Sequence, residues 1–500
     1  MRETGWPSGT GTGSGVGSRG SDAGPGPGAR GVGSRGAGFR GAGPGPGAPG
    51  AGSRGAGSGL GTARGTGLFL GAVLGPGVLA LPHLAAAAAG PASVVAWAAL
   101  LALSVPVALT FAALGGRFPD GGGVATFARR AFGSRTAAVT GWWFYFTVPV
   151  GVPAAAMIAG EYVASGLGLG PAGTAAVTCA LLVAAFAANH AGLRFSGGLQ
   201  LLLAGLLVAL LVAAVAAALP AVRPQEFTPF APHGWSGVAH AAGVLFFAFV
   251  GWEAASHLSA EFADPRRHLV RATVLTLAIV GVLYLGLAVT AIGVLGERAA
   301  TSPVPLALLL EHGAGQAARP VTAGVALLLS FGAINTYVAG GARLGAALAR
   351  DGALPAWVAG PPVPGGRNGG AAGGPVPEPG EGAPHRSLAV LALMSGALTA
   401  AALGYGIGLD PLMRTTSACL AAVTVVGVAA ATRLLSGAGR RTAAVATVLT
   451  LVLLASCGPY LLVPAALAAA GLAISRLGRA AGTSRIRTFR VRSARPPGTP

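Results

Sequence analysis

A carboxylate, Glu253, lies within an apolar stretch that is long enough to cross a lipid bilayer. Placing a carboxylate at mid-bilayer costs roughly 2.5–3.5 kcal/mol on insertion scales, and carboxylates retained at this depth are usually functional. His257 follows four residues later, and both groups can titrate when their surroundings perturb them. The pair therefore predicts proton handling inside the membrane. The alternative is that Glu253, protonated or paired, only holds neighbouring helices together.

A second unusual stretch, Gly75-Pro76-Gly77, interrupts the first long apolar segment. Pro76 lacks an N–H, and in a helix its ring collides with the carbonyl of Ala72, while the flanking glycines allow irregular backbone. The second half of a broken helix begins with unpaired N–H groups near Val78 and Leu79, and this positive helix end suits a carboxylate. A proline kink repaired by neighbouring helices is the alternative interpretation.

The two stretches are related by their spacing along the chain. Gly251 weakens the helix beside Glu253, so the sixth apolar segment also carries a predicted break, five segments after the first. An odd offset gives the two five-segment halves opposite orientations, which is the pattern of an inverted repeat with broken helices meeting at the bilayer midplane. We therefore favour one shared site over two separate kinks.

Composition defines the class of protein that holds this site. The chain has 500 residues, of which 53% are hydrophobic and 9% charged, as in an all-α polytopic membrane protein. Lysine is absent, which excludes a P-loop and a Schiff-base lysine, and Cys179, Cys419 and Cys457 lie singly without metal-site spacing. With no nucleophile motif or metal cluster, we expect neither an enzyme nor a cofactor, and no metal site.

About twelve transmembrane helices are predicted from the apolar segments. They cover approximately 66–89, 92–115, 137–165, 171–190, 197–219, 237–258, 268–296, 319–349, 386–404, 410–434, 442–457 and 459–477. The last two are short, so 442–477 forms either two spans or one hairpin.

Arginine placement predicts the orientation of these spans. With the N-terminus inside, 29 of the 33 arginines fall on the cytoplasmic side, and only Arg223, Arg298, Arg319 and Arg414 fall outside. This asymmetry follows the positive-inside rule and supports an even number of spans. We expect a multi-pass protein of the cell membrane with both termini cytoplasmic.

Three further segments have compositions that cannot build a core. Residues 1–65 are rich in Gly, Ala, Pro and Arg and predict a disordered cytoplasmic tail; residues 359–385 predict a disordered cytoplasmic loop. Residues 478–500 form a basic tail suited to the anionic inner leaflet. The transmembrane domain is thus 66–477. Aromatic residues do not interleave the Arg-Gly repeats, so we expect no nucleic-acid partner.

These motifs resemble the amino acid–polyamine–organocation (APC) superfamily of permeases. Gly75-Pro76-Gly77-Val78 takes the place of the family's first-helix Gly-(Ser/Thr/Ala)-Gly-Ile motif, from which Pro76 departs. The remaining matches are Arg117-Phe118-Pro119 with Gly121-Gly122, the stretch Phe246 to Glu253 with Glu261, Pro265, Arg271 and Ala272, and Ala342-Arg343-Leu344 with 349–355. Within the family, the stretches 74–82, 149–153 and 251–253 with His257 look closest to bacterial exporters of methionine and branched-chain amino acids.

The resemblance implies a fold and a set of residue roles. The fold is a five-plus-five inverted repeat (LeuT-like) with discontinuous helices 1 and 6, two extra C-terminal helices, and alternating access. The implied substrate-binding residues are Gly75, Pro76, Gly77, Val78, Phe249, Val250, Gly251 and Trp252. Backbone N–H groups of the first break would hold the substrate carboxylate, carbonyls of the second would hold its ammonium group, and Trp252 would shape the side-chain pocket.

The predicted function is secondary active transport of amino acids, and the apolar candidate walls favour neutral apolar substrates. The alternative is a membrane-embedded amino-acid sensor or scaffold with a transporter-like body. Glu253 and His257 are the proton-coupling candidates and favour protons over sodium, for which Ser330, Asn335 and Thr336 supply candidate oxygens. The partners are then the amino acid and the lipid bilayer, while the direction of transport and the oligomeric state stay open.

Overall fold

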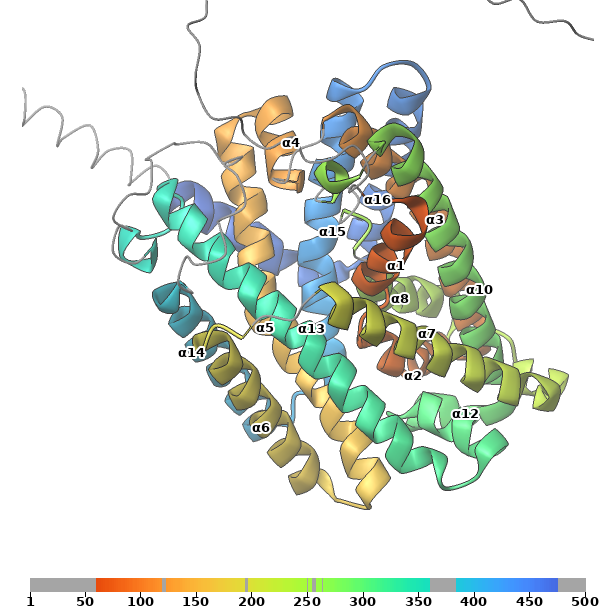
Figure 1. Cartoon of the computed structure of the whole chain (residues 1–500). Helices are drawn as coiled ribbons and strands as arrows, with labels where there is room; N and C mark the ends of the chain where they lie inside the picture. Colours follow the sequence, from red (N-terminus) through yellow and green to blue (C-terminus); the bar gives the residue numbers. More distant parts are fainter. Residues whose placement is uncertain are drawn as a thin grey trace, which may run out of the picture. The chain divides into compact units, whose positions relative to one another are not determined.

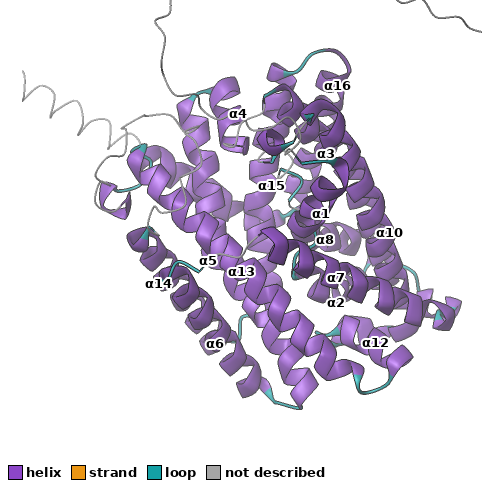
Figure 2. Ribbon diagram, in the orientation of Figure 1, coloured by secondary structure: helices purple, strands orange, loops and turns teal. Residues whose placement is uncertain are grey.

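A computed structural model describes residues 60–118, 123–193, 197–249, 251–253, 258–262, 264–359 and 384–474 of the chain. All of them belong to one compact unit. The described part is built from helices and their connections and contains no β-strand (Figure 2). The predicted tail 1–65, the loop 359–385 and the tail 478–500 lie almost wholly outside the described residues. At the first boundary, helix α1 begins at Thr62, four residues before the predicted start of the membrane domain.

Long apolar helices account for most of the described chain. Nine are long and apolar enough to cross a membrane: Gly77–Arg117, Ser134–Leu167, Pro171–His190, Gly197–Ala221, Pro265–Leu295, Ala318–Arg350, His385–Tyr405, Leu409–Leu434 and Gly437–Ser456. Two shorter apolar helices, Gly234–Phe249 and Gly458–Ile474, fall on the predicted sixth and twelfth spans. The first of the nine contains two predicted spans, because α2 (Gly77–Ala89) and α3 (Ser93–Arg117) are joined by one 3-10 turn. Each predicted span therefore coincides with a helical segment, while the number of membrane crossings stays a prediction.

Several buried hydroxyls within these helices donate to the backbone of their own helix. The hydroxyl of Ser104 donates to the carbonyl of Leu100, and those of Thr273 and Thr276 donate to the carbonyls four residues before them, at 2.8–2.9 Å. A hydroxyl paired in this way can be buried in an apolar helix without a partner from another helix. The helices are therefore free to pack through their apolar faces.

The buried side chains form two hydrophobic clusters. The smaller one is built by α5 (Ser134–Leu167), α6 (Pro171–His190), α13 (Ala318–Arg350) and α14 (His385–Tyr405). The larger one includes side chains from α1 (Thr62–Val73), α2, α3, α7 (Gly197–Ala218), α8 (Gly234–Leu245), α10 (Val270–Leu295), α12 (Pro305–Ala314), α15 (Leu409–Leu434) and α16 (Gly437–Ser456). Helices α5, α13 and α14 contribute to both clusters, and α5 and α13 cross the middle of the bundle (Figure 1). The two candidate breaks lie in the larger cluster.

Candidate functional site between two interrupted helices

The first predicted break is present. Helix α1 ends at Val73, α2 begins at Gly77, and the residues between them leave the helical path at Leu74 (φ −82°, ψ 85°). This confirms the interruption predicted at Gly75-Pro76-Gly77. Pro76 sits at the N-cap of α2 with φ −60°, the value its ring imposes.

The backbone of this break is only partly self-satisfied. The N–H of Gly75 donates to the carbonyl of Val73 at 3.1 Å. The N–H groups of Val78 and Leu79, expected to be unpaired, donate to carbonyls three residues back at 3.3 and 3.1 Å, because the first turn of α2 is tight. Among the described residues, the Gly77 N–H forms no hydrogen bond. It is the donor at the start of α2 that remains for a bound group.

The second predicted break is also present. Helix α8 ends at Leu245, earlier than the break predicted at Gly251, because the chain first tightens into the 3-10 turn η4 (Phe246–Phe249). It then leaves the helix at Gly251, whose φ of +116° favours glycine. The carboxylate of Glu253 folds back and accepts a hydrogen bond from the Gly251 N–H at 3.0 Å. Val250 and His257 lie outside the described residues, so their predicted roles stay predictions.

The two breaks lie against each other. A Cβ placed on Gly251 would lie 2.5 Å from the carbonyl oxygen of Ala72, at the end of α1. A Cβ on Gly77 would meet the ring of Phe247 in η4, also at 2.5 Å. Glycine at both positions therefore allows the contact, and the predicted proximity of the breaks is confirmed.

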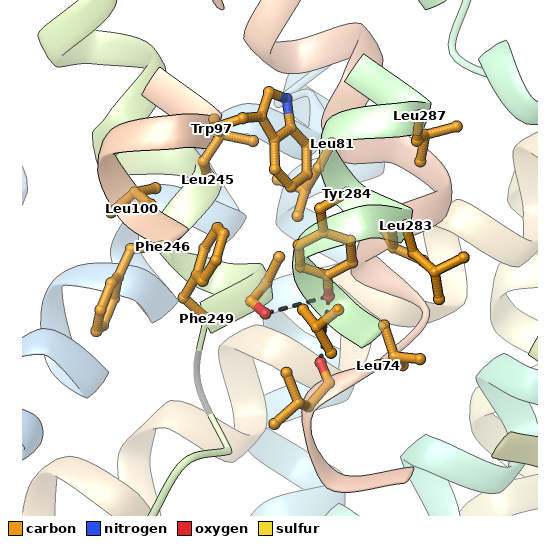
Figure 3. Packing of buried hydrophobic residues seen from close by; sticks show 14 of the residues in the cluster. Leu74, Leu81, Trp97, Leu100, Leu245, Phe246, Phe249, Leu283, Tyr284 and Leu287 are labelled. Carbon is orange, nitrogen blue, oxygen red and sulfur yellow. Dashed lines mark hydrogen bonds between the residues drawn. The ribbon is translucent and has the colours of Figure 1, made fainter. Parts of the chain in front are cut away.

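A residue that the sequence analysis missed, Tyr284 of α10, joins the two breaks. Its buried hydroxyl lies 3.4 Å from the carbonyl oxygen of Val73 and 3.3 Å from that of Ala248, which precedes the second break (Figure 3). A hydroxyl has one proton, so it donates to one of these carbonyls at a time. The available signal was a lone tyrosine in the middle of the seventh apolar segment.

Aromatic packing holds this hydroxyl in place. The ring of Tyr284 meets Trp97 of α3 at 5.1 Å and Phe249 at 5.5 Å between centroids, both edge to face, and Trp97 and Phe249 are 6.0 Å apart (Figure 3). Edge-to-face pairs of this kind contribute about 0.5–1.5 kcal/mol each beyond their buried area. The Phe249 side chain, predicted as a pocket wall, is thus part of this aromatic cluster and only 3% exposed.

Two of the three candidate sodium ligands on α13, Asn335 and Thr336, already form hydrogen bonds within the protein. Asn335 accepts a 2.7 Å hydrogen bond from Asn189 of α6, and the Thr336 hydroxyl donates to the carbonyl of Gly332. The buried Ser330 hydroxyl has no partner within the described part of the chain. Asn335 therefore links two helices of the smaller cluster.

A bundle of membrane-length helices, with two interrupted helices in contact at its core, is the architecture of a polytopic membrane transporter. Residues 60–474 match the family described as "Amino acid permease", and the chain belongs to that family. The protein is therefore a multi-pass membrane protein of the APC superfamily whose function is amino-acid transport, and it is not an enzyme.

Two relatives illustrate the relationship. The chain is 33% identical to an uncharacterized amino acid permease of Bacillus subtilis, YecA, over 82% of this chain and 93% of the relative. It is 35% identical to the L-methionine/branched-chain amino acid exporter YjeH of Escherichia coli, over 57% of this chain and 68% of the relative.

Proposed function

We propose that this chain is a secondary active transporter that moves neutral apolar amino acids by alternating access, with the substrate held between the two breaks. The observation that carries the proposal is the contact between them, with Gly251 against Ala72 and Gly77 against Phe247. Backbone freed from regular helix at membrane depth is stable only against protein or a polar cavity, and here the two freed segments share one place.

The backbone polarity fits the two ends of an amino acid. The Gly77 N–H lies at the positive end of α2, which suits the α-carboxylate. The carbonyls of Ala72 and Val73 and the carboxylate of Glu253 lie at the contact of the breaks and suit the α-ammonium group. Gly75, where an added Cβ would meet nothing within 4 Å, leaves open space beside these groups.

The candidate walls favour an apolar side chain. Val78, Leu79 and Trp252 are buried in the larger cluster beside the breaks. Each buried methylene of a substrate would gain about 0.8 kcal/mol, whereas a cationic side chain would need a carboxylate of its own. The similarity to an exporter of L-methionine and branched-chain amino acids supports the same substrate class, and it supports export as the direction.

Proton coupling is the mechanism that we favour. Glu253 receives the Gly251 N–H at the second break, so protonation of its carboxylate would weaken a hydrogen bond inside the site itself. Protonation of Glu253 would thereby change the hydrogen bond that fixes the backbone at Gly251.

The proposal is tested with purified protein in proteoliposomes under imposed proton or sodium gradients. We expect labelled leucine, isoleucine, valine or methionine to be moved, and arginine, lysine and glutamate to compete poorly. Competition should require both the α-amino and the α-carboxyl group. Equal competition by a simple amine would refute the backbone account. Amino-acid binding without any flux would favour the sensor alternative.

A further inference from the structure

The indole N–H of Trp252 is a buried hydrogen-bond donor without a partner. The side chain is 3% exposed, and its Nε1 forms no hydrogen bond within the part of the chain that the structure describes. Two other tryptophans are satisfied: Trp142 donates to the carbonyl of Ala353 at 2.7 Å, and Trp143 to that of Pro464 at 2.8 Å. A buried unpaired donor is costly, and one that persists in a native site calls for a partner that binds there.

Its position places this donor at the proposed site. Trp252 directly follows Gly251, the residue that touches the end of α1, and directly precedes Glu253, whose carboxylate is held on the Gly251 N–H. Trp252 is therefore flanked in the chain by the residue that makes the contact between the breaks and by the carboxylate proposed to bind substrate.

Charge decides which part of the substrate this donor meets. The Glu253 carboxylate repels the substrate's α-carboxylate and attracts its α-ammonium group. The ammonium group thus faces the second break, and the carboxylate faces the Gly77 N–H at the start of α2. The part of the substrate left for Trp252 is the side chain. This step rests on the proposed function.

We propose that the Trp252 indole N–H donates a hydrogen bond to an acceptor atom in the substrate side chain. The preferred substrates are then neutral amino acids with an acceptor at the δ position, as in the thioether of methionine, over an all-carbon chain of equal length. A thioether sulfur is a weak acceptor and also makes favourable contacts with aromatic rings. Leucine and norleucine gain the apolar contacts but leave the indole N–H unpaired.

Three isosteric substrates test this directly. Norleucine, methionine and O-methylhomoserine carry CH₂, sulfur and oxygen at the δ position, and their competition constants are measured in proteoliposomes. For the unmodified protein we expect methionine to compete about five-fold better than norleucine, the size of one modest hydrogen bond. In Trp252→Phe, which keeps an aromatic ring but loses the donor, this ratio should fall below about two-fold. In the same variant, competition by O-methylhomoserine should weaken more than competition by norleucine.

Trp142→Phe is the matched control, because it removes an equally buried indole N–H whose partner belongs to the protein. Its methionine-to-norleucine ratio should stay unchanged. An unchanged ratio in Trp252→Phe, or equal weakening of all three substrates, would overturn the inference. If Trp252→Phe does not fold, equal competition by norleucine and methionine in the unmodified protein overturns it alone. Each of these outcomes overturns the inference about Trp252 while amino-acid flux persists. Absence of any flux would instead refute the proposed function.

Discussion

At the scale of single residues, the hydroxyl of Tyr284 links the two interrupted helices. Tyr284 is fully buried on α10, and its oxygen reaches carbonyls that belong to both interrupted helices. The Val73 carbonyl already accepts the Gly75 N–H at 3.1 Å, and buried backbone carbonyls at a helix break are stabilised by further donors. The tyrosine hydroxyl offers such a donor to Val73 or Ala248 and ties the two breaks to a third helix.

Tyr284→Phe should therefore weaken the site while keeping the aromatic cluster. We expect about 1–2 kcal/mol lower stability, since the hydroxyl is lost and two buried carbonyls share one donor fewer. Apparent substrate affinity should fall in parallel. Thermal unfolding in detergent and concentration-dependent flux measure the two effects. Tyr145→Phe is the control, because that hydroxyl lies near Ser387, away from the breaks; an equal loss of affinity there would argue against a specific role for Tyr284.

Glu253 carries the charge of the site. Glu253→Gln keeps an oxygen that can accept the Gly251 N–H but removes the titratable group. Because hydrogen bonds to charged groups are stronger than neutral ones by about 1 kcal/mol, we expect transport efficiency to fall about five-fold. The transport rate of Glu253→Gln should no longer depend on an imposed proton gradient, while the protein still inserts into the membrane. Flux measured at several pH values decides the matter: full rate with unchanged pH dependence would make Glu253 a structural residue.

At the scale of elements, the decisive feature is how closely the two broken helices approach. Gly251 combines a positive φ with a backbone oxygen at 2.5 Å from the position of a Cβ. Backbone cannot move aside as a flexible side chain can, so α1 and the turn after η4 would have to separate to admit even a methyl group. The approach of the two elements is therefore set by the absence of a side chain.

Gly251→Ala should abolish transport. Strain at such φ values costs about 1–3 kcal/mol, and the clash with Ala72 adds to it. Gly133→Ala separates the two effects, because Gly133 has φ +89° but nothing within 4 Å of an added Cβ. We expect Gly133→Ala to be destabilised in thermal unfolding only by the backbone strain and to keep its transport activity. Active Gly251→Ala protein would mean that the breaks do not need to touch.

At the scale of the whole molecule, two hydrophobic clusters share α5, α13 and α14. The smaller is tied by the Asn189–Asn335 pair, and the larger contains both breaks. Both breaks thus pack into one of the two clusters, and relative movement of helix groups in alternating access stays a proposal. The five-plus-five inverted repeat stays a prediction from the spacing of the breaks.

Membrane orientation can be tested on the intact protein. In a cysteine-free background, Ser134→Cys and Thr301→Cys each add one exposed thiol, at the start of α5 and at the end of the short helix Glu297–Thr301. If the positive-inside rule holds here, a membrane-impermeant maleimide should label Thr301→Cys in whole cells and Ser134→Cys only after lysis. The reverse pattern would invert the topology and place both termini outside.

The sequence by itself determined the class of protein and the places where two helices break. Composition and segment length predict a polytopic helical protein, and the breaks follow from local covalent facts: Pro76 lacks an N–H, and Gly75, Gly77 and Gly251 lack a Cβ. Such effects act within a few residues along the chain, so they can be read without knowing which helices are neighbours.

Only the tertiary structure decided which groups meet at the breaks. Tyr284 lies 211 residues from Val73 in sequence, and nothing local marks its hydroxyl as the donor for that carbonyl. The pairing of Asn335 with Asn189, the aromatic cluster around Phe249 and the unpaired indole of Trp252 likewise depend on which helices lie side by side. Hydrogen bonds and ring contacts reach only a few ångströms, so their partners are fixed by packing, and packing is a property of the whole bundle.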